Sequence, residues 1–160
     1  MAPAPLAPKA VPLTTIRLAT ERDIPAMVGL LGALFAIEAD FTIDPAVQQR
    51  GLALLLARGE AAVLVACAGE SVVGMASVQL TVSTARGGLS AGIEDVIVAA
   101  GHRGTGLGRR LIEAAEAWAR AKGAVRLALL ADETNAAALD FYDRLGFART
   151  RLVWLARPLE

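Results

Sequence analysis

The sequence predicts a single α/β domain, in which one mixed and twisted β-sheet is flanked by helices in the order β-α-α-β-β-β-α-β-α-β. Apolar residues form blocks typical of strands at residues 61–68 and 71–82, and they recur with helical spacing at residues 24–34 and 107–119. Only Gly69-Glu70 separates the two strand blocks, which indicates an antiparallel hairpin. Helices separate the later strands, so we expect parallel pairing only in the second half of the sheet. The 160 residues, without repeats or a change in composition, fit one domain.

The first half of the chain supplies the opening strand and two helices. Residues 1–12 contain four prolines and one lysine, so we expect a flexible leader before a domain at residues 13–160. A strand is expected at Thr14–Leu18, and Thr20 with Asp23 forms a capping-box pattern. The helix that follows has its expected inner face at Ile24, Met27, Val28, Leu31 and Leu34. Asp44 before Pro45 marks a second helix start, with an expected inner face at Val47, Gly51, Leu54 and Leu55.

The second half alternates strands and helices. Residues 83–89 are expected to form a loop and residues 93–98 a strand. A glycine-rich loop at residues 101–108 then leads into a helix with an apolar stripe of Leu107, Leu111, Ala115, Trp118 and Ala119. A strand at residues 125–131 and a helix at residues 135–145 follow, with Gly146 as a left-handed helix end. Residues 147–156 are expected to close the sheet as its last strand.

Composition narrows the class of protein. Sixteen Lys and Arg balance sixteen Asp and Glu, so no positive field exists to gather nucleic acid. No run of about 18 apolar residues is long enough to cross a membrane. The single cysteine, Cys67, lies in an apolar strand, where a structural thiol is expected, and it suits a reducing cytosol. No histidine and cysteine cluster with metal-ligand spacing occurs. We therefore expect a cytoplasmic protein without a metal, a nucleic-acid partner or a membrane partner.

The loop Arg103-Gly104-Thr105-Gly106-Leu107-Gly108 has the composition of a phosphate-binding loop. Glycines let the backbone approach a ligand, and a helix N-terminus offers unpaired N–H groups. Arg103 adds a positive charge; a flexible surface loop is the alternative. A dinucleotide-binding loop requires Gly-x-Gly-x-x-Gly directly after the strand, with an acid about 20 residues further on. Asp132 could be taken for that acid, but the glycine spacing here is Gly-x-Gly-x-Gly. A Walker loop is excluded because no Gly-Lys-Ser/Thr occurs.

Two motifs in register carry a family resemblance. Val96-Ile97-Val98 followed by Arg103 to Gly108 resembles the acetyl-CoA signature of the GCN5-related N-acetyltransferase (GNAT) family, Arg/Gln-x-x-Gly-x-Gly/Ala. A second family signature is matched by Asn135, Ala138 and Phe141-Tyr142-Asp143-Arg144-Leu145-Gly146-Phe147. Residues 16–20 with Asp23 resemble the family's opening strand and helix, and the resemblance covers about residues 14–155. Ala100 stands where many members have proline.

The resemblance implies the GNAT fold and acetyl-CoA as co-substrate. The implied reaction transfers an acetyl group to a primary amine of a small molecule or peptide by direct attack on the thioester. The implied coenzyme-binding residues are Val96, Ile97, Val98, Arg103, Gly104, Thr105, Gly106, Leu107, Gly108 and Asn135. Tyr142 occupies the family's position for the general acid, with a core residue of its helix as the alternative, and Asn135 could be a helix-start residue. A catalytically silent acyl-CoA-binding sensor of the same fold is the alternative function, and a homodimer is compatible with either.

An amine acceptor requires a base, because an alkylammonium with a pKa near 10.4 is neutral in only about one molecule in a few thousand at pH 7. Glu94 and Asp95 are the candidates, and strand alternation is expected to send them to opposite faces, so that at most one faces the cleft. Both could instead be solvent-facing carboxylates, and His102 is expected to be structural or close to the coenzyme. For acceptor binding the family uses the junction of the first two helices. The candidates there are Phe35, Glu38, Asp40 and Phe41, and a solvated helix end is the alternative.

Overall fold

A computed structural model describes residues 13–38 and 40–159 of the protein. These residues fall into two compact units, divided after Leu130, which are taken in turn. The expected leader at residues 1–12 lies outside the described residues. None of the described helices is both long and apolar enough to span a bilayer.

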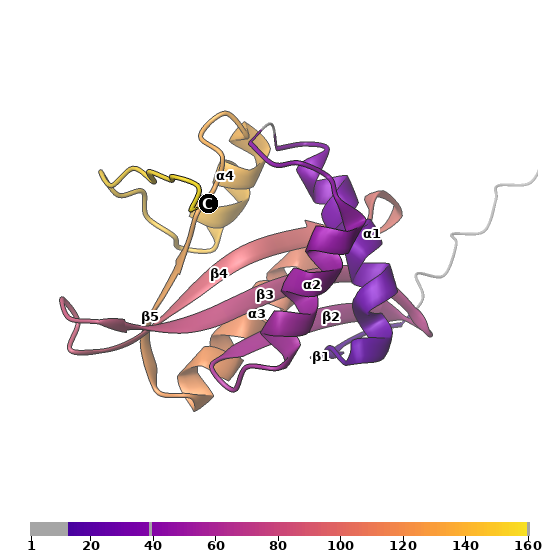
Figure 1. Ribbon diagram of the computed structural model, residues 1–160, viewed down its shortest axis with the longest axis horizontal. Helices are drawn as coiled ribbons and strands as arrows, with labels where there is room; N and C mark the ends of the chain where they lie inside the picture. Colours follow the sequence, from indigo (N-terminus) through magenta and orange to yellow (C-terminus); the bar gives the residue numbers. More distant parts are fainter. Residues whose placement is uncertain (1–12, 39, 160) are drawn as a thin grey trace, which may run out of the picture. The chain divides into compact units, whose positions relative to one another are not determined.

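The first unit is built on a 5-stranded sheet in the order β1-β2-β3-β4-β5 (Figure 1). The strands are β1 (Thr14–Leu18), β2 (Ala61–Ala68), β3 (Ser71–Ser83), β4 (Gly88–Val98) and β5 (Ala124–Leu129). Neighbouring strands pair antiparallel except β4 and β5, which pair parallel. The predicted mixed sheet, with parallel pairing confined to its second half, is confirmed.

Helices cover both faces of this sheet. The helices α1 (Ile24–Phe35) and α2 (Pro45–Leu56) share one face, where the core consists of Met27, Leu30, Leu31, Leu52, Val63, Val65, Cys67, Met75 and Ile97 (Figure 1). The helix α3 (Leu107–Ala121) packs on the other face, where Leu111 lies so close to Gly74 that a Cβ there would meet its Cδ1 at 3.2 Å. Cys67 is buried and free, as expected of a structural thiol.

The inner face of α2 differs from the prediction. Gln48 and Leu52 are buried, whereas the predicted Val47 and Leu54 are 46% and 67% exposed. The reason lies in the loop before the helix: the side chain of Gln48 accepts a hydrogen bond from Asp44 N at 2.9 Å and donates one to Thr42 O at 3.3 Å. These bonds turn Gln48 inward, and the apolar face moves with it.

The strand β4 begins earlier than expected, because only residues 84–87 of the predicted loop at 83–89 form the turn. Gly88 is already a strand residue, paired with Ser83. A Cβ at Gly88 would meet Val125 Cγ2 at 3.3 Å, so this glycine allows β5 to pack closely rather than marking a loop.

The second unit contains α4 (Ala136–Arg144), with Asn135 as its N-cap. Gly146 ends the helix with φ +86°, as the sequence predicted. The predicted last strand at residues 147–156 is wrong for the structure described here, since no strand is assigned to residues 147–159. A strand is defined by a ladder of backbone hydrogen bonds to a neighbour, and apolar alternation alone does not supply one. The apolar side chains of this segment are accordingly exposed, as at Leu152 and Trp154.

A bidentate ion pair joins β1 to the start of α1. Arg17 Nη1 and Nη2 donate to the two carboxylate oxygens of Asp23 at 2.7 and 2.8 Å, and Thr20 N donates to Asp23 Oδ2 at 2.7 Å. Thr20 and Asp23 form the predicted capping box around the short 3-10 turn η1 (Glu21–Asp23). The hydrogen bond from Arg17 is the main cause that holds the pKa of Asp23 below its usual range. The buried Asp23 carboxylate therefore fixes the entry of the chain into α1.

Replacing Asp23 with Asn is expected to lower the free energy of unfolding at pH 7 by about 2 kcal/mol, the range of hydrogen bonds to charged groups. Because folding lowers the pKa of Asp23, its contribution is complete above the unfolded pKa of about 3.9 and is lost as pH falls below it. The deficit of Asp23→Asn should thus shrink in urea unfolding series carried from pH 7 toward pH 2. The control is Asp44→Asn, which keeps an equally good cap on α2. A deficit that is the same at pH 7 and pH 3 would show that the Asp23 charge is not the cause.

Candidate functional site

A β-bulge in β4 shapes the site. Along the β3–β4 ladder, Ala76 pairs with Val96 and Val78 pairs with Ile93, so two residues of β4 lie opposite the single residue Ser77. The two residues are Glu94 and Asp95. A bulge of this kind breaks the regular alternation of side chains and bends the strand.

The bulge joins Asp95 to the fully buried Ser77. Ser77 Oγ donates to Asp95 Oδ2 at 2.7 Å, and Asp95 N donates to Ser77 Oγ at 3.0 Å. The hydroxyl therefore orients both the side chain and the backbone of Asp95. The pKa of Asp95 is raised, chiefly because burial disfavours its anion and also because Glu94 is close, while the Ser77 bond opposes the shift.

Glu94 lies on the same face of the sheet as Asp95. Gln79 Nε2 donates to Glu94 Oε2 at 2.8 Å, and Gln79 is two residues from Ser77 along β3, hence on the same face. The expectation that Glu94 and Asp95 point to opposite faces is therefore wrong, because alternation fails at the bulge. This face also carries Met75 and Ile97, the core residues beneath α1 and α2.

The edge of β4 beyond the bulge is open on the side of β5. The parallel pairing of β4 with β5 runs from Leu89 to Ile93, and within the described residues it extends no further. Asp95 N and Ala99 N are directed at β3, since they donate to Ser77 Oγ at 3.0 Å and to Val73 O at 2.8 Å. Successive amides of a strand point in opposite directions, so the N–H groups of Val96 and Val98 point to the open side.

The glycine loop follows this edge. Gly104 and Gly106 have φ of +73° and +82°, the left-handed region that favours glycine, and a Cβ at either position would meet no atom within 4 Å. The space above both backbones is thus open to a ligand. Arg103 Nε donates to Val98 O at 2.9 Å, which ties the loop to β4, and Thr105 Oγ1 donates to His102 O at 2.7 Å.

The helix α3 begins directly after this loop, with Gly106 as its N-cap. Its first intrahelical bond runs from Arg110 N to Gly106 O at 3.2 Å, so the amides of Leu107, Gly108 and Arg109 have no partner within the helix. Unpaired amides at the positive end of a 15-residue helix, beside two open glycines, suit a pyrophosphate. His102 belongs to the short turn η2 (Ala100–His102) before the loop, and its imidazole makes no hydrogen bond among the described residues.

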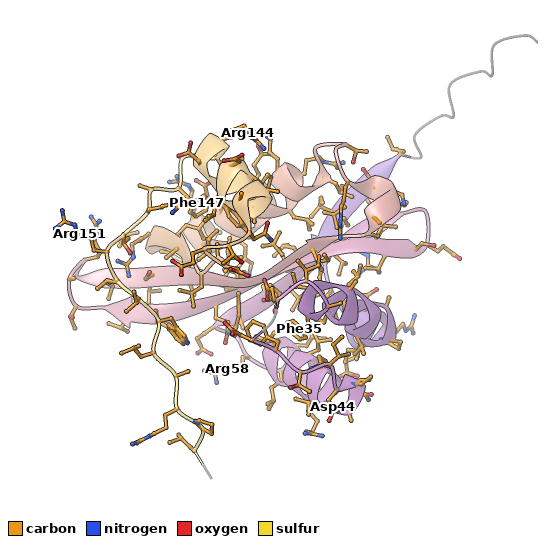
Figure 2. All side chains as sticks on the ribbon, turned by 90° about the horizontal axis from the view of Figure 1, so that it is seen from above. Phe35, Asp44, Arg58, Arg144, Phe147 and Arg151 are labelled. Carbon is orange, nitrogen blue, oxygen red and sulfur yellow. The ribbon has the colours of Figure 1, made fainter. Side chains whose placement is uncertain are left out.

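The junction of α1 and α2 carries the residues expected to bind the acceptor. Phe35 and Phe41 stack with ring centroids 5.0 Å apart, and Phe35 packs against the core beneath α1 and α2. Figure 2 shows Phe35 at the end of α1 and Asp44 at the start of α2. Asp40 is exposed, and Glu38 is half-buried and engaged by neighbouring groups. This region shares with Glu94 and Asp95 the face of the sheet that α1 and α2 cover.

The second unit holds the two remaining candidates. Asn135 Oδ1 accepts a hydrogen bond from Ala138 N at 3.1 Å, which is the helix-start role that the sequence left open. Tyr142 is half-buried between Phe141 and Phe147, with ring centroids 5.1 and 5.8 Å away in edge-on geometry. Both aromatic contacts orient the phenol ring within its own unit.

Ser77 and Gln79 are the residues that the sequence analysis missed. They interrupt the apolar run of β3, and a buried polar side chain in such a run requires a hydrogen-bond partner. Glu94 and Asp95, on the next strand, were the available partners. Among the described residues, no group of three or more His, Cys, Asp and Glu side chains is placed to hold a metal ion.

A glycine loop at a helix start, beside an open strand edge, agrees with the acyltransferase class that the motifs predicted. A family model described as the acetyltransferase (GNAT) family matches residues 33–147. The chain belongs to this family.

Two curated relatives are N-acetyltransferases that match over part of their length. Streptothricin acetyltransferase of Streptomyces lavendulae is 50% identical over 56 residues, which are 35% of this chain and 30% of that protein. Glucosamine 6-phosphate N-acetyltransferase of Trypanosoma brucei brucei is 40% identical over 77 residues, which are 48% of this chain and 50% of that protein. The matches thus span half or less of these relatives.

Solved structures match over nearly the whole chain. A transcriptional regulator from Bacillus halodurans C-125 has a TM-score of 0.80 and 30% identity, covering 92% of this chain and 100% of that one. An aminoglycoside acetyltransferase from an uncultured soil metagenomic sample, in complex with sisomicin, has a TM-score of 0.75 and 25% identity, covering 92% and 97%. The aminoglycoside N-acetyltransferase AAC(6')-Iy in complex with CoA shares the fold, with a TM-score of 0.80, 20% identity and coverage of 96% and 99%.

Asp95→Asn is expected to stabilise the protein at pH 7 by about 1 kcal/mol, because a neutral amide avoids the cost of ionising a carboxylate that folding buries. Because folding raises the pKa of Asp95, its ionisation costs stability as pH rises above the unfolded value of about 3.9. Below that value Asp95 is protonated in both states, so the gain should vanish in urea unfolding at pH 3. The control Asp140→Asn alters an exposed aspartate of α4 and should change little. A variant less stable than wild type at both pH values would contradict the strained-anion explanation.

Proposed function

We propose that the protein is an acetyl-CoA-dependent N-acetyltransferase that acetylates a primary amine of a small molecule. The observation that carries this proposal is the pair of carboxylates gathered by the bulge, immediately before the open edge of β4. A base beside a strand edge with free N–H groups is the arrangement that amine attack on a thioester requires.

The coenzyme is expected to lie on the glycine loop and the β4 edge. The open backbone at Gly104 and Gly106, together with the first amides of α3, would hold the pyrophosphate, and exposed Arg103 would add charge. The N–H groups of Val96 and Val98 would bind the pantetheine arm and the thioester oxygen. The match to the family's coenzyme motif supports this placement, and so does AAC(6')-Iy, which shares the fold and was solved with CoA and with a CoA bisubstrate analogue.

Different residues carry out the proton transfers of the reaction. Glu94 or Asp95 takes one proton from the acceptor ammonium, and the neutral nitrogen then attacks the thioester carbon. An N–H group of β4 stabilises the oxyanion that forms. The C–S bond breaks with its electrons on sulfur, Tyr142 protonates the thiolate, and the phenol recovers the second proton of the nitrogen.

The acceptor is expected to approach over the face that α1 and α2 cover. Phe35 and Phe41 would form apolar walls, and Glu38 and Asp40 would add negative charge for an ammonium. A relative that acetylates streptothricin and a solved neighbour bound to sisomicin support an amine acceptor of small-molecule size. A thiol-release screen with acetyl-CoA against diamines, aminoglycosides, amino acids and peptides tests the proposal. Coenzyme binding without turnover on any amine would instead support an acyl-CoA sensor.

Gly106→Val is expected to abolish coenzyme binding. A β-branched residue at φ +82° is strained, and its side chain would fill the open space above the loop. Isothermal titration with CoA should show at least a hundredfold loss of affinity, with circular dichroism confirming the fold. The matched control is Gly101→Val, in the turn η2 that precedes Arg103 to Gly108, where φ is not positive. Unchanged affinity in a folded Gly106→Val protein would place the coenzyme elsewhere.

Tyr142→Phe is expected to lower kcat by about 10²–10⁴, the value of a general acid, while leaving CoA affinity within a few-fold. The aromatic contacts to Phe141 and Phe147 are kept, so packing changes little. The control Phe141→Leu alters packing in the same cluster without removing a proton donor. If steady-state kinetics on the best amine show the same small loss of kcat in both variants, Tyr142 is a packing residue.

A further inference from the structure

The bulge holds its two carboxylates in different ways, and this difference assigns them different tasks. Ser77 engages one oxygen of Asp95, and Gln79 engages one oxygen of Glu94. Among residues 13–38 and 40–159, the second oxygen of each carboxylate accepts no hydrogen bond. Since no buried side-chain oxygen in this part of the chain lacks a partner, Asp95 Oδ1 reaches solvent. Each acid thus has one oxygen held by β3 and one that a ligand can reach.

The two acids differ in exposure and in the stiffness of their supports. Glu94 is exposed, and its partner Gln79 is a flexible side chain on a half-buried position. Asp95 is half-buried, and its partner Ser77 is fully buried and bonds to both the side chain and the backbone of Asp95. A proton acceptor must be held in place, whereas a docking charge must be reachable from solvent.

We propose that Asp95, positioned by Ser77, is the base that deprotonates the acceptor amine, and that Glu94, held by Gln79, binds the incoming ammonium. This rests on the proposed acetyl transfer. Asp95 Oδ1 takes one proton from the ammonium, the N–C bond forms to the thioester carbon, and the C–S electrons leave on sulfur. The second proton of the nitrogen ends on the thiol, so charge and atoms balance.

Few charged side chains lie on the elements around Asp95, and the loop after α1 adds Glu38 and Asp40 on the same face of the sheet. α1 and β3 contain no titratable side chain, and β2 contains only Cys67. On α2 the one charged residue is the exposed Arg50, and on β5 Arg126 donates to Ser90 Oγ at 3.0 Å. Among these groups Glu94 is the charge that raises the pKa of Asp95, and two substitutions should move the titration of Asp95 in opposite directions. Loss of the Ser77 hydroxyl removes a bond that favours the anion, and loss of the Glu94 charge removes a repulsion that disfavours it.

The test is the pH dependence of kcat/KM for the best amine of the screen. Asp95→Asn should lower kcat/KM by a factor of about 10²–10⁴, and the acid limb of its pH profile should disappear. Ser77→Ala should move the acid limb to higher pH while nearly full activity returns at alkaline pH, the result expected of a positioning residue. Glu94→Gln should move the limb to lower pH and raise KM for the amine about tenfold, with a smaller change in kcat. Ser83→Ala, a buried serine of the same strand, and Glu70→Gln, in the β2–β3 turn, are the matched controls, and both should leave the profile unchanged.

A second measurement reads the pair without turnover. In ¹³C-labelled protein without coenzyme, the carboxyl resonance of Asp95 should titrate at higher pH in Ser77→Ala and at lower pH in Glu94→Gln. A protein that acetylates no amine would overturn the proposed function, while this titration would still decide the coupling. Removal of the acid limb by Glu94→Gln but not by Asp95→Asn would reverse the two roles and overturn the proposal. If folded Ser77→Ala changes neither the acid limb of the kcat/KM profile nor the titration of the Asp95 carboxyl, Ser77 has only a packing role.

Discussion

The extra residue in β4 opposite Ser77 is the constraint on which the rest of the site depends. It turns two successive carboxylates to one face of the sheet, and the pairing of β4 with β5 ends at Ile93, directly before the bulge. Bulges bend the strand that carries them, so both effects have one local origin. The acids and the open backbone edge are adjacent because the same irregularity produces them.

Sequence patterns predicted what is locally encoded. Thr20 with Asp23 and Asp44 before Pro45 each specify a helix start through residues a few positions apart, and both are confirmed in the structure. The glycine loop in particular could be identified because its φ values of +73° and +82° are ones that few other residues adopt. The roles of Tyr142 and Asn135 toward a coenzyme stay predictions.

The errors share a different physical cause, since each depends on a contact distant in sequence. The bulge is stabilised by Ser77, 18 residues before Asp95, and Gly88 is a strand residue that pairs with Ser83 and packs closely against Val125. The face of α2 is set by Gln48 bonding to the preceding loop, and a final strand at residues 147–156 would require a neighbour that no local pattern supplies. Alternation and helical spacing assume regular elements, so they fail where a tertiary hydrogen bond adds or shifts one residue.

The electrostatics of the face under α1 and α2 connect this geometry to the acceptor. Burial raises the pKa of Asp95, and the neighbouring Glu94 raises it further, yet none of the ion pairs among the described residues joins either acid to a Lys or Arg. Two carboxylates gathered without a protein cation repel each other and weaken the fold, and such arrangements concentrate at functional sites. An acceptor ammonium would supply the missing positive charge, and it would be attracted most strongly before it loses its proton. In the proposed reaction the acetylated nitrogen would be a neutral amide, so this attraction would be lost and the product would be free to leave.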